Sequence, residues 1–177
     1  MNRAGKWAVG ILLTAAAAAG ALQTVSAPTQ TEPLPVQNEA CGYQWAYSPA
    51  LQLSEEFDAE VKAMDSDASG RVEYFGEDCI HPDGTSDFLA KETDFYFRLK
   101  VNDLKQEEEF GNWIVKVMRY VTKIPREDLS GSYGFVDFWF EKTEAEHIAF
   151  RVSIQEYIDE AQGKNGAELF QRFYNPP

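Results

Sequence analysis

The chain has 177 residues, of which 44% are hydrophobic and 14% aromatic, which is enough for a folded core and excludes wholesale disorder. Its formal net charge at pH 7 is −13, which disfavours nucleic acid and anionic lipid surfaces as partners because both are negatively charged. The length suits one ordinary domain after a targeting segment is removed.

The N-terminal segment has the features of a secretory signal peptide. Arg3 and Lys6 precede an uncharged stretch over residues 7–22, which is shorter than the ~20 residues that span a bilayer as a helix. Cleavage after Ala21 is preferred to cleavage after Ala27, because a proline follows Ala27. An uncleaved membrane anchor is the alternative. We therefore expect a secreted or extracytoplasmic protein of the bacterial cell envelope, in contact with a membrane only if this segment is retained.

A linker is predicted after the signal peptide, which we assign to residues 1–27. Residues 28–40 contain three prolines together with threonine and glutamine, a composition typical of an extended spacer. The single folded domain is therefore expected to cover residues 41–177.

The two cysteines, Cys41 and Cys79, both follow the signal peptide. In an oxidising compartment an even number of cysteines indicates disulfide bonding, and here only one pairing exists. A two-thiol metal site or a catalytic thiol is the alternative, but no second pair of ligands has the spacing of a metal site. The sequence therefore predicts a structural disulfide.

The first half of the domain predicts a helix followed by a hairpin. Ser48 suits the N-cap and Pro49 the first helical position, and turn-forming residues end the helix near Met64. Two strands are predicted over residues 71–79 and 93–102. In the second strand, apolar Phe95, Phe97, Leu99 and Val101 alternate with polar side chains, as in a strand with one buried face.

The second half repeats this order. Asp103 is the expected cap of a strongly amphipathic helix that ends at Pro125. Two further strands over residues 135–140 and 148–155 form a second hairpin, and a short helix closes the chain. The order helix, strand, strand, helix, strand, strand, helix predicts an α+β two-layer sandwich, with an antiparallel four-stranded sheet and helices on one face.

Three short segments carry a resemblance to known proteins. They are Gly-Glu-Asp-Cys at 76–79, Glu-Thr-Asp-Phe at 92–95 and Gly-Asn-Trp-Ile at 111–114. Together they resemble a group of small secreted bacterial proteins without an assigned activity, over residues 72–121. The resemblance implies a secreted α+β domain and no catalytic residues.

A segment after the first helix matches the start of an EF-hand calcium loop. Asp65, Asp67 and Ser69 alternate before Gly70, so that two carboxylates and a hydroxyl would converge on Ca²⁺. The twelfth position of the loop is Gly76 instead of glutamate, and a strand follows instead of a helix. A simple helix-to-strand turn is therefore the favoured interpretation, with calcium as the alternative.

A group of aromatic and basic residues is predicted on the polar face of the sheet, as an interface for an extracellular protein or a glycan would require. The alternative is that the C-terminal helix, with Phe170 and Phe173, covers this face. The candidate binding residues are Tyr96, Arg98, Lys100, Phe135 and Trp139.

Catalytic motifs are not apparent. The serines form no nucleophile elbow, no glycine-rich phosphate loop is present, and His81 and His147 lie in no catalytic pattern. The sequence therefore favours a binding module without a cofactor over an enzyme. The alternative is an extracellular hydrolase, with or without calcium, whose acidic residues would converge near Asp65, Asp67 and Asp78.

Overall fold

The computed structural model of the protein describes residues 41–174. The predicted signal peptide at 1–27 and linker at 28–40 lie outside these residues. Within the described part, no helix is long and apolar enough to cross a membrane.

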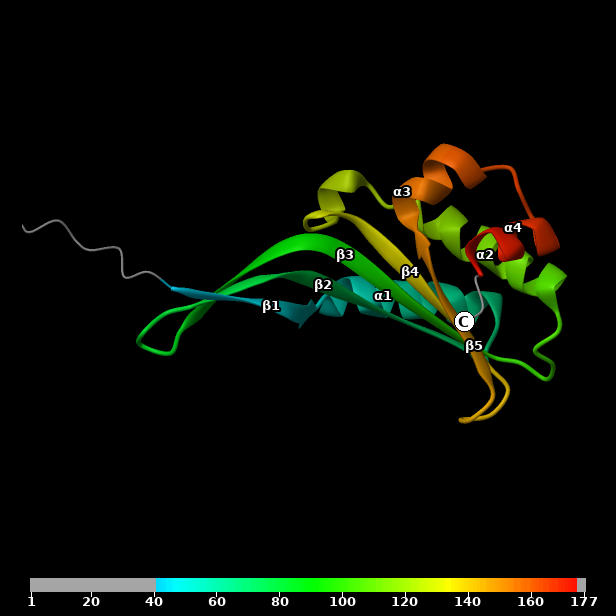
Figure 1. Cartoon of the computed structure of the whole chain (residues 1–177), viewed down its shortest axis with the longest axis horizontal. Coiled ribbons are helices and arrows are strands. Elements are labelled where there is room, and N and C mark those ends of the chain that lie inside the picture. The colour runs from blue at the N-terminus through cyan, green and yellow to red at the C-terminus, as the bar shows by residue number, and fades with distance from the viewer. Residues whose placement is uncertain (1–40, 175–177) are drawn as a thin grey trace, which may run out of the picture. The chain divides into compact units, whose positions relative to one another are not determined.

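Five strands form one mixed sheet in the order β1-β2-β3-β4-β5, and the described residues belong to one compact unit (Figure 1). Neighbouring strands are antiparallel except for β3 and β4, which are parallel. The elements are β1 (Gly42–Pro49), α1 (Leu51–Met64), β2 (Ala68–Ile80), β3 (Ser86–Lys100), α2 (Glu107–Val121), the 3-10 turn η1 (Arg126–Asp128), β4 (Ser132–Glu141), β5 (His147–Ser153), α3 (Ile154–Glu156), the π-helical turn η2 (Tyr157–Ala161) and α4 (Gly166–Phe173).

The predicted α+β class and both hairpins are confirmed, but the predicted sheet is wrong in two respects. The aromatic segment before α1 forms a fifth strand, β1, along β2. The β3–β4 pair is parallel because α2 lies between these two strands in the chain and returns it to the end of the sheet where β3 begins. The pattern of alternation in each strand was compatible with either direction of pairing.

The predicted start of the first helix is also wrong. Ser48 and Pro49 belong to β1, and α1 begins at Leu51 without a side-chain cap. Contacts with β2 fix this position instead. The Ser54 hydroxyl donates to the Val72 carbonyl at 3.0 Å and accepts from the Val72 amide at 2.8 Å, which ties the first turn of α1 to the sheet.

The predicted N-cap of the second helix, Asp103, is also wrong. Asp103 accepts a hydrogen bond from the Lys105 amide at 3.1 Å, so it stabilises a turn before the helix. The N-cap position is occupied by Gln106, which makes no capping hydrogen bond. The predicted apolar face of this helix is buried in the core.

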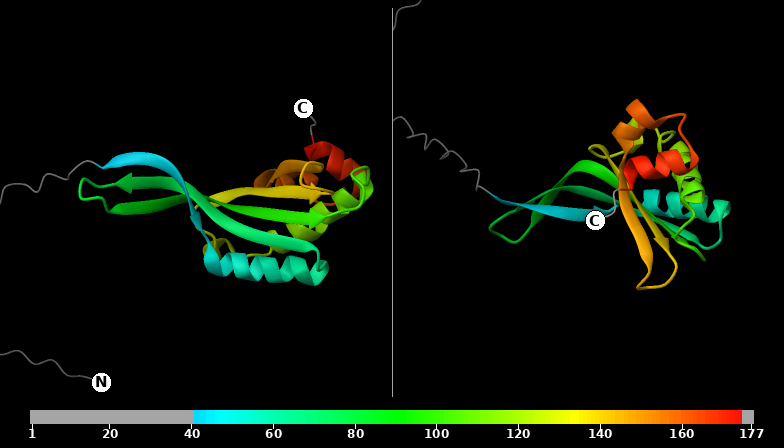
Figure 2. Two further views of the ribbon diagram at one scale, coloured as in Figure 1. Left: turned by 90° about the horizontal axis from the view of Figure 1, so that it is seen from below. Right: turned by 45° about the vertical axis from the view of Figure 1, so that its right-hand side comes forward.

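The core lies on one face of the sheet, and α1, α2 and α4 cover that face (Figure 2). Phe95, Phe97 and Leu99 of β3 are buried on this face, as their alternation predicted, with Phe95 against Phe57 of α1 and Phe97 against Trp113 of α2. Aromatic rings make the main contacts, and substituting any of them leaves a cavity that the surrounding rings fill only in part. The ring-centroid distances are 5.3 Å for Phe57–Phe95, 5.4 Å for Phe97–Trp113, 4.2 Å for Phe110–Phe140 and 5.5 Å for Phe150–Phe170.

Beyond the helices, β1, β2 and β3 continue as a three-stranded arm, formed by residues 42–48, 75–80 and 86–91 (Figures 1 and 2). A bulge marks its base, where Lys91 of β3 has no opposite residue in β2. The close approach of the strands there requires glycine at position 76, because a Cβ would lie 2.1 Å from the Leu89 carbonyl oxygen. Gly76 is the arm's single buried residue, so the arm has no core of its own.

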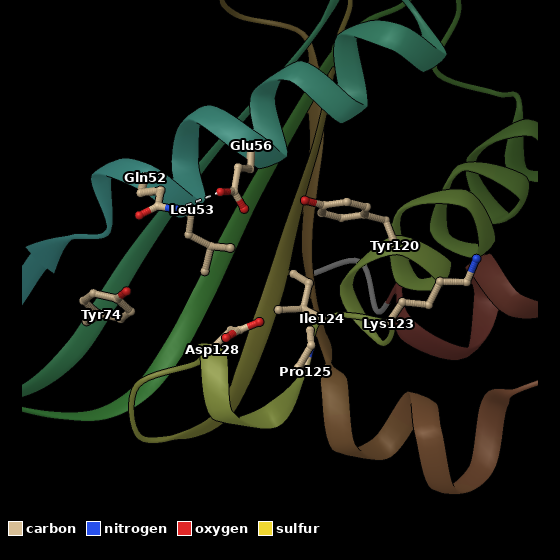
Figure 3. A pocket seen from close by; sticks show the side chains of 9 residues that line it. All are labelled: Gln52, Leu53, Glu56, Tyr74, Tyr120, Lys123, Ile124, Pro125 and Asp128. Carbon is tan, nitrogen blue, oxygen red and sulfur yellow. Dashed lines mark hydrogen bonds between the residues drawn. The ribbon is translucent and has the colours of Figure 1, made fainter.

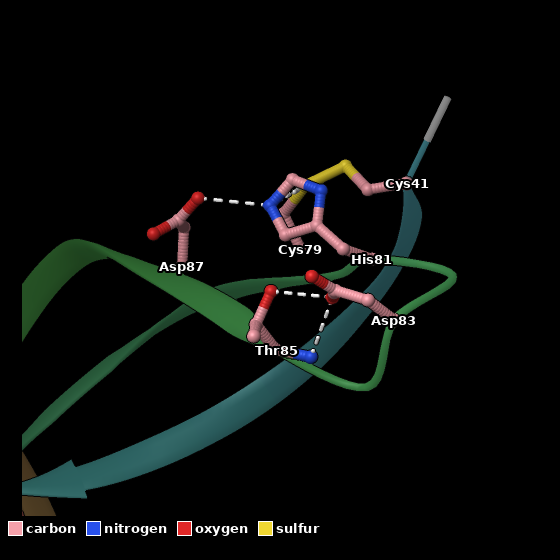
Figure 4. The surroundings of a disulfide bond; sticks show 6 residues. All are labelled: Cys41, Cys79, His81, Asp83, Thr85 and Asp87. Atoms are coloured by element: carbon pink, nitrogen blue, oxygen red, sulfur yellow. Dashed lines mark hydrogen bonds and ion pairs between the residues drawn. A yellow bond between two sulfur atoms is a disulfide. The ribbon is translucent and has the colours of Figure 1, made fainter. Parts of the chain in front are cut away.

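The predicted disulfide is confirmed at the tip of the arm, where Cys41 and Cys79 are bonded with 5.4 Å between their Cα atoms (Figure 4). Nearby, His81 lies 2.9 Å from Asp87, between Nε2 and Oδ2. The disulfide holds the start of β1 against the end of β2, in a region where few side chains are buried. A disulfide is consistent with an oxidising, extracytoplasmic compartment.

The substitution Phe97→Ala tests the aromatic core. It removes contacts with Trp113, Phe138 and Phe140, and should lower the free energy of unfolding by about 3–5 kcal/mol in urea denaturation. The control is Leu89→Ala in the same strand, where the side chain is 59% exposed and the change should be within about 0.5 kcal/mol. Equal effects at the two positions would contradict the assigned core.

Replacing both Cys41 and Cys79 by serine tests the cross-link. The loss of a bridge over a sequence separation of 38 should lower the free energy of unfolding by up to roughly 4 kcal/mol, because the unfolded chain gains conformational freedom. Wild-type protein in reductant should reach the stability of the double variant, and the double variant should not respond to reductant. Free thiols in exported wild-type protein, detected by intact mass after alkylation, would refute the bond.

Candidate functional site

The sheet face opposite the helices is open in the described part of the chain. Along each strand the polar side chains point to this face, and the pairing of the strands sets them side by side. Arg98 of β3 lies next to Trp139 of β4, and Tyr96 lies next to Asp137, which in turn lies next to Arg151 of β5. We call this surface the open face.

The alternative that the C-terminal helix covers the open face is wrong. Phe170 of α4 lies against Phe110 of α2, with a ring-centroid distance of 5.6 Å, and against Phe150 of β5. Both contacts are on the core side of the sheet. Among residues 41–174, the helices therefore leave the open face uncovered.

The five predicted binding residues share the open face. Arg98 and Lys100 are exposed, Tyr96 and Phe135 are half-buried, and Trp139 is 37% exposed. Asp137 of β4 and Arg151 of β5 lie beside these residues on the same face. The sequence predicted this set through the alternation in β3 and β4, and the parallel pairing of these strands brings its members together.

Three arginines on the open face are each paired with a carboxylate. Each pair joins positive and negative groups within the face, so these charges cancel locally although the whole chain carries −13. The pairing also limits the rotamers of long side chains that would otherwise be mobile. The pairs are Arg71–Glu73, Arg98–Glu141 with 2.6 Å between Nε and Oε2, and Arg151–Asp137 with 3.0 Å between Nε and Oδ2.

The same arginines contact aromatic rings. A guanidinium above a ring is attracted to its electron-rich face and fixes the orientation of that ring. The distances from the guanidinium carbon to the ring centroid are 3.8 Å for Arg71 over Tyr96, 5.7 Å for Arg151 over Phe135 and 6.0 Å for Arg98 over Trp139. The rings of the open face are therefore held in place by side chains of the same face.

A hollow of about 310 Å³ lies at the centre of the open face. It adjoins a second hollow of about 500 Å³ toward the β4–β5 turn, and Ser69 and Arg98 line both. The side chains around the first hollow include both hydrogen-bond donors and aromatic surfaces. These are Arg71, Tyr96, Arg98, Asp137 and Trp139.

Asp94 is a buried carboxylate at the edge of the open face. It accepts a hydrogen bond from the Phe135 amide at 2.9 Å, where two residues of β4 lie opposite one residue of β3. Position 134 must be glycine, because a Cβ would lie 2.0 Å from Asp94 Oδ1. Burial raises the pKa of the Asp94 carboxyl above its usual value, against the lowering effect of the Phe135 hydrogen bond.

The phenol of Tyr96 is a fixed donor at pH 7. Burial raises the pKa of Tyr96 well above its usual value, and the negative charges of Glu73 and Asp94 raise it further. The hydroxyl therefore stays protonated over the whole physiological range. The Glu73 carboxylate also accepts a hydrogen bond from this phenol, which contributes to the raised pKa.

Sequence reasoning missed the aromatic residues of β1. Tyr43, Trp45 and Tyr47 are 73%, 63% and 54% exposed, and they point to the same side as the open face. Phe75 of β2 stacks on Trp45 with 5.2 Å between ring centroids. The signal was present in the sequence, since the three aromatic residues alternate with Gln44 and two small residues, which is a strand pattern.

The candidate calcium residues form the turn between α1 and β2. Asp65 ends the helix and accepts a hydrogen bond from the Asp67 amide at 2.8 Å, whereas Ser69 already belongs to β2. Among residues 41–174, no three side chains of histidine, cysteine, aspartate or glutamate are grouped as metal ligands. Asp78 lies near the other end of β2, roughly 35 Å from Asp67 at the usual rise of a strand, so these carboxylates do not converge.

A separate cleft of about 580 Å³ lies on the helical side, between α1 and the end of α2 (Figure 3). Tyr120 borders this cleft together with Glu56, Lys123 and Asp128. Burial raises the pKa of Tyr120, and nearby Glu56 and Glu60 add to this effect. The sequence did not predict this cleft, because it depends on how two helices far apart in the chain approach each other.

No family model, curated protein or solved structure matches this chain. The resemblance to small secreted bacterial proteins therefore remains a prediction from three short segments. The case for a function depends on the open face itself.

Asp94→Asn tests the buried carboxylate. The pKa of Asp94 is raised in the folded state, so folding favours the protonated acid. As the pH rises above the usual carboxyl pKa, the unfolded chain loses this proton first, and Asp94 then lowers the free energy of unfolding until its raised pKa is passed. The free energy of unfolding of the variant, minus that of wild type, should therefore increase between pH 3 and 7, as measured by urea denaturation. The same pH dependence of the free energy of unfolding in the variant and in wild type would contradict the raised pKa of Asp94.

Asp58→Asn is the matched control, because it should give the opposite sign. Hydrogen bonds from Lys62 and the Gly70 amide lower the pKa of Asp58, so its charge stabilises the fold above the usual carboxyl pKa. Removing it should therefore make the difference in unfolding free energy more negative as the pH rises.

Proposed function

We propose that this protein is exported and acts as a binding module, and that its open face recognises a neutral glycan. The observation that carries the proposal is that exposed aromatic rings of β1 and β4 point to the same side of the sheet as the ion-paired polar groups, and no helix among residues 41–174 covers that side. Exposed aromatic side chains gathered on one side of a domain are typical of interaction sites. The signal peptide and the disulfide support an extracytoplasmic setting.

The chemistry of the open face suits sugar rings. A pyranose ring presents apolar C–H groups on its faces and hydroxyls at its edge. Trp45, Tyr47 and Trp139 offer flat apolar surfaces against which the C–H faces can stack. The arginine–carboxylate pairs offer both donors and acceptors for the hydroxyls. Arg98 lies over Trp139, and Phe75 packs against Trp45 and Tyr47, so these contacts limit the motion of the three rings and reduce the conformational entropy that binding would otherwise cost.

The charge balance favours a neutral glycan over a charged protein. Tryptophan, tyrosine and arginine are also the residues that dominate protein interfaces, so a protein is the competing ligand. However, Arg71, Arg98 and Arg151 are already paired with carboxylates on the same face, so they attract an acidic partner only weakly. An uncharged ligand needs no such attraction.

A hydrolase has less support. Its predicted carboxylates, Asp67 and Asp78, lie toward opposite ends of β2. The buried carboxylate of Asp94 accepts a backbone hydrogen bond that closes an irregularity between β3 and β4, which is a structural role. We therefore keep binding as the proposed function.

The experiment uses the exported protein and a panel of soluble neutral polysaccharides, namely glucans, mannans, xylans and chitin oligosaccharides. Binding is measured by isothermal titration calorimetry. Trp139→Ala and Trp45→Ala should each weaken the affinity for a bound glycan by roughly tenfold or more, because each removes a ring that contacts the ligand.

The control for the binding experiment is Leu51→Ala, since Leu51 is 71% exposed on α1, away from the open face. Its affinity should equal that of wild type. The proposal fails if no neutral glycan binds, or if the tryptophan variants bind as well as wild type. A ligand that proves to be a protein overturns the glycan assignment.

A further inference from the structure

β1 lies at one edge of the sheet with a single neighbour, β2. The backbone groups along its outer side therefore have no partner strand among the described residues. Such an edge is a ready template for another strand. Its length of eight residues makes it long for an unpaired edge.

Proteins usually protect an exposed edge with charged side chains, bulges or prolines. β1 has no charged residue, and its pairing with β2 is regular throughout. Pro49 stands only at its last position, beside α1. The opposite edge, β5, carries His147 and Arg151, which shows the usual protection. β1 is therefore an exception to the usual protection of edge strands by charge, in a chain that otherwise carries many charged residues and a net charge of −13.

The aromatic residues of β1 are symmetric about Trp45. Tyr43 and Tyr47 stand two positions before and after it, so the pattern reads the same in both directions. In an antiparallel pair of two such strands centred at Trp45, each Trp45 lies opposite its counterpart and each Tyr43 lies opposite a Tyr47. Aromatic pairs across neighbouring strands stabilise a sheet.

We propose that the exported protein forms a two-fold symmetric dimer through antiparallel pairing of β1 with β1 of a second copy. A symmetric interface requires a self-complementary surface, and the pattern centred at Trp45 provides one. A foreign strand would need no such symmetry, which favours a second copy as the occupant. The absence of charge on β1 removes direct repulsion at the seam.

The dimer has a consequence for the open face. Residues directly opposite each other in an antiparallel pair point to the same side of a sheet. Both copies would therefore present their open faces on one side of a continuous sheet, with six β1 aromatic rings at its centre. The inference does not depend on the proposed ligand, because the seam is formed by backbone groups of the edge.

Sedimentation velocity of the exported protein, without glycan, tests the dimer over a concentration series. Wild type should show concentration-dependent dimerisation, and added salt should strengthen it because it screens the repulsion between two acidic chains. Trp45→Glu places two like charges opposite each other and should leave only monomer. Leu89→Glu is the matched control, since it adds the same charge to the same arm on β3, the arm strand farthest from the β1 edge, and should still dimerise.

Cross-linking tests the register and does not depend on a loss of association. Both native cysteines are bonded, so an added cysteine is the single free thiol. With a short thiol-reactive cross-linker, Trp45→Cys should form covalent dimers with itself. Tyr47→Cys alone should not, whereas a mixture of Tyr43→Cys and Tyr47→Cys should. Wild type that stays monomeric at all concentrations, or Tyr47→Cys that cross-links as well as Trp45→Cys, overturns the proposal.

Discussion

The structure depends on the burial of one apolar face of the sheet by every helix that packs against it. Phe95, Phe97 and Leu99 of β3 lie at the centre of this contact, with α1 and α2 above them. Because successive residues of a strand point to opposite sides, this burial also fixes which side chains lie on the other face. The candidate binding surface is thus set by the same register that builds the core.

The parallel crossover between β3 and β4 decides which polar residues become neighbours. It places Tyr96 beside Asp137 and Arg98 beside Trp139, in an arrangement that an antiparallel pair of these strands would not produce. The adjoining arginine–carboxylate pairs then hold the rings in position. A surface whose side chains are already ordered in this way would bind a ligand, as proposed, at a lower entropic cost than a mobile surface.

Much of the fold could be predicted from local patterns. The alternation in β3 and the helical spacing of α2 each indicate one element, and the two cysteines allow one disulfide. The direction of β4 could not be predicted, because alternation of side chains is the same in parallel and antiparallel strands. The strand β1 was missed because Ser48 and Pro49 also suit a helix start, and only the contact of Ser54 with Val72 shows where α1 begins.

The arm and the helix-covered part of the sheet differ in how strongly folding constrains their side chains. Apart from the disulfide at its tip and Gly76 at its base, the arm contributes almost nothing to the core, so substitutions of its exposed side chains should change the stability of the domain only slightly. The requirements of folding therefore fall mainly on the helices and the central strands, and only weakly on the exposed side chains of β1. If β1 takes part in binding as proposed, substitutions at the exposed Tyr43, Trp45 and Tyr47 would change the ligand preference without disturbing the fold.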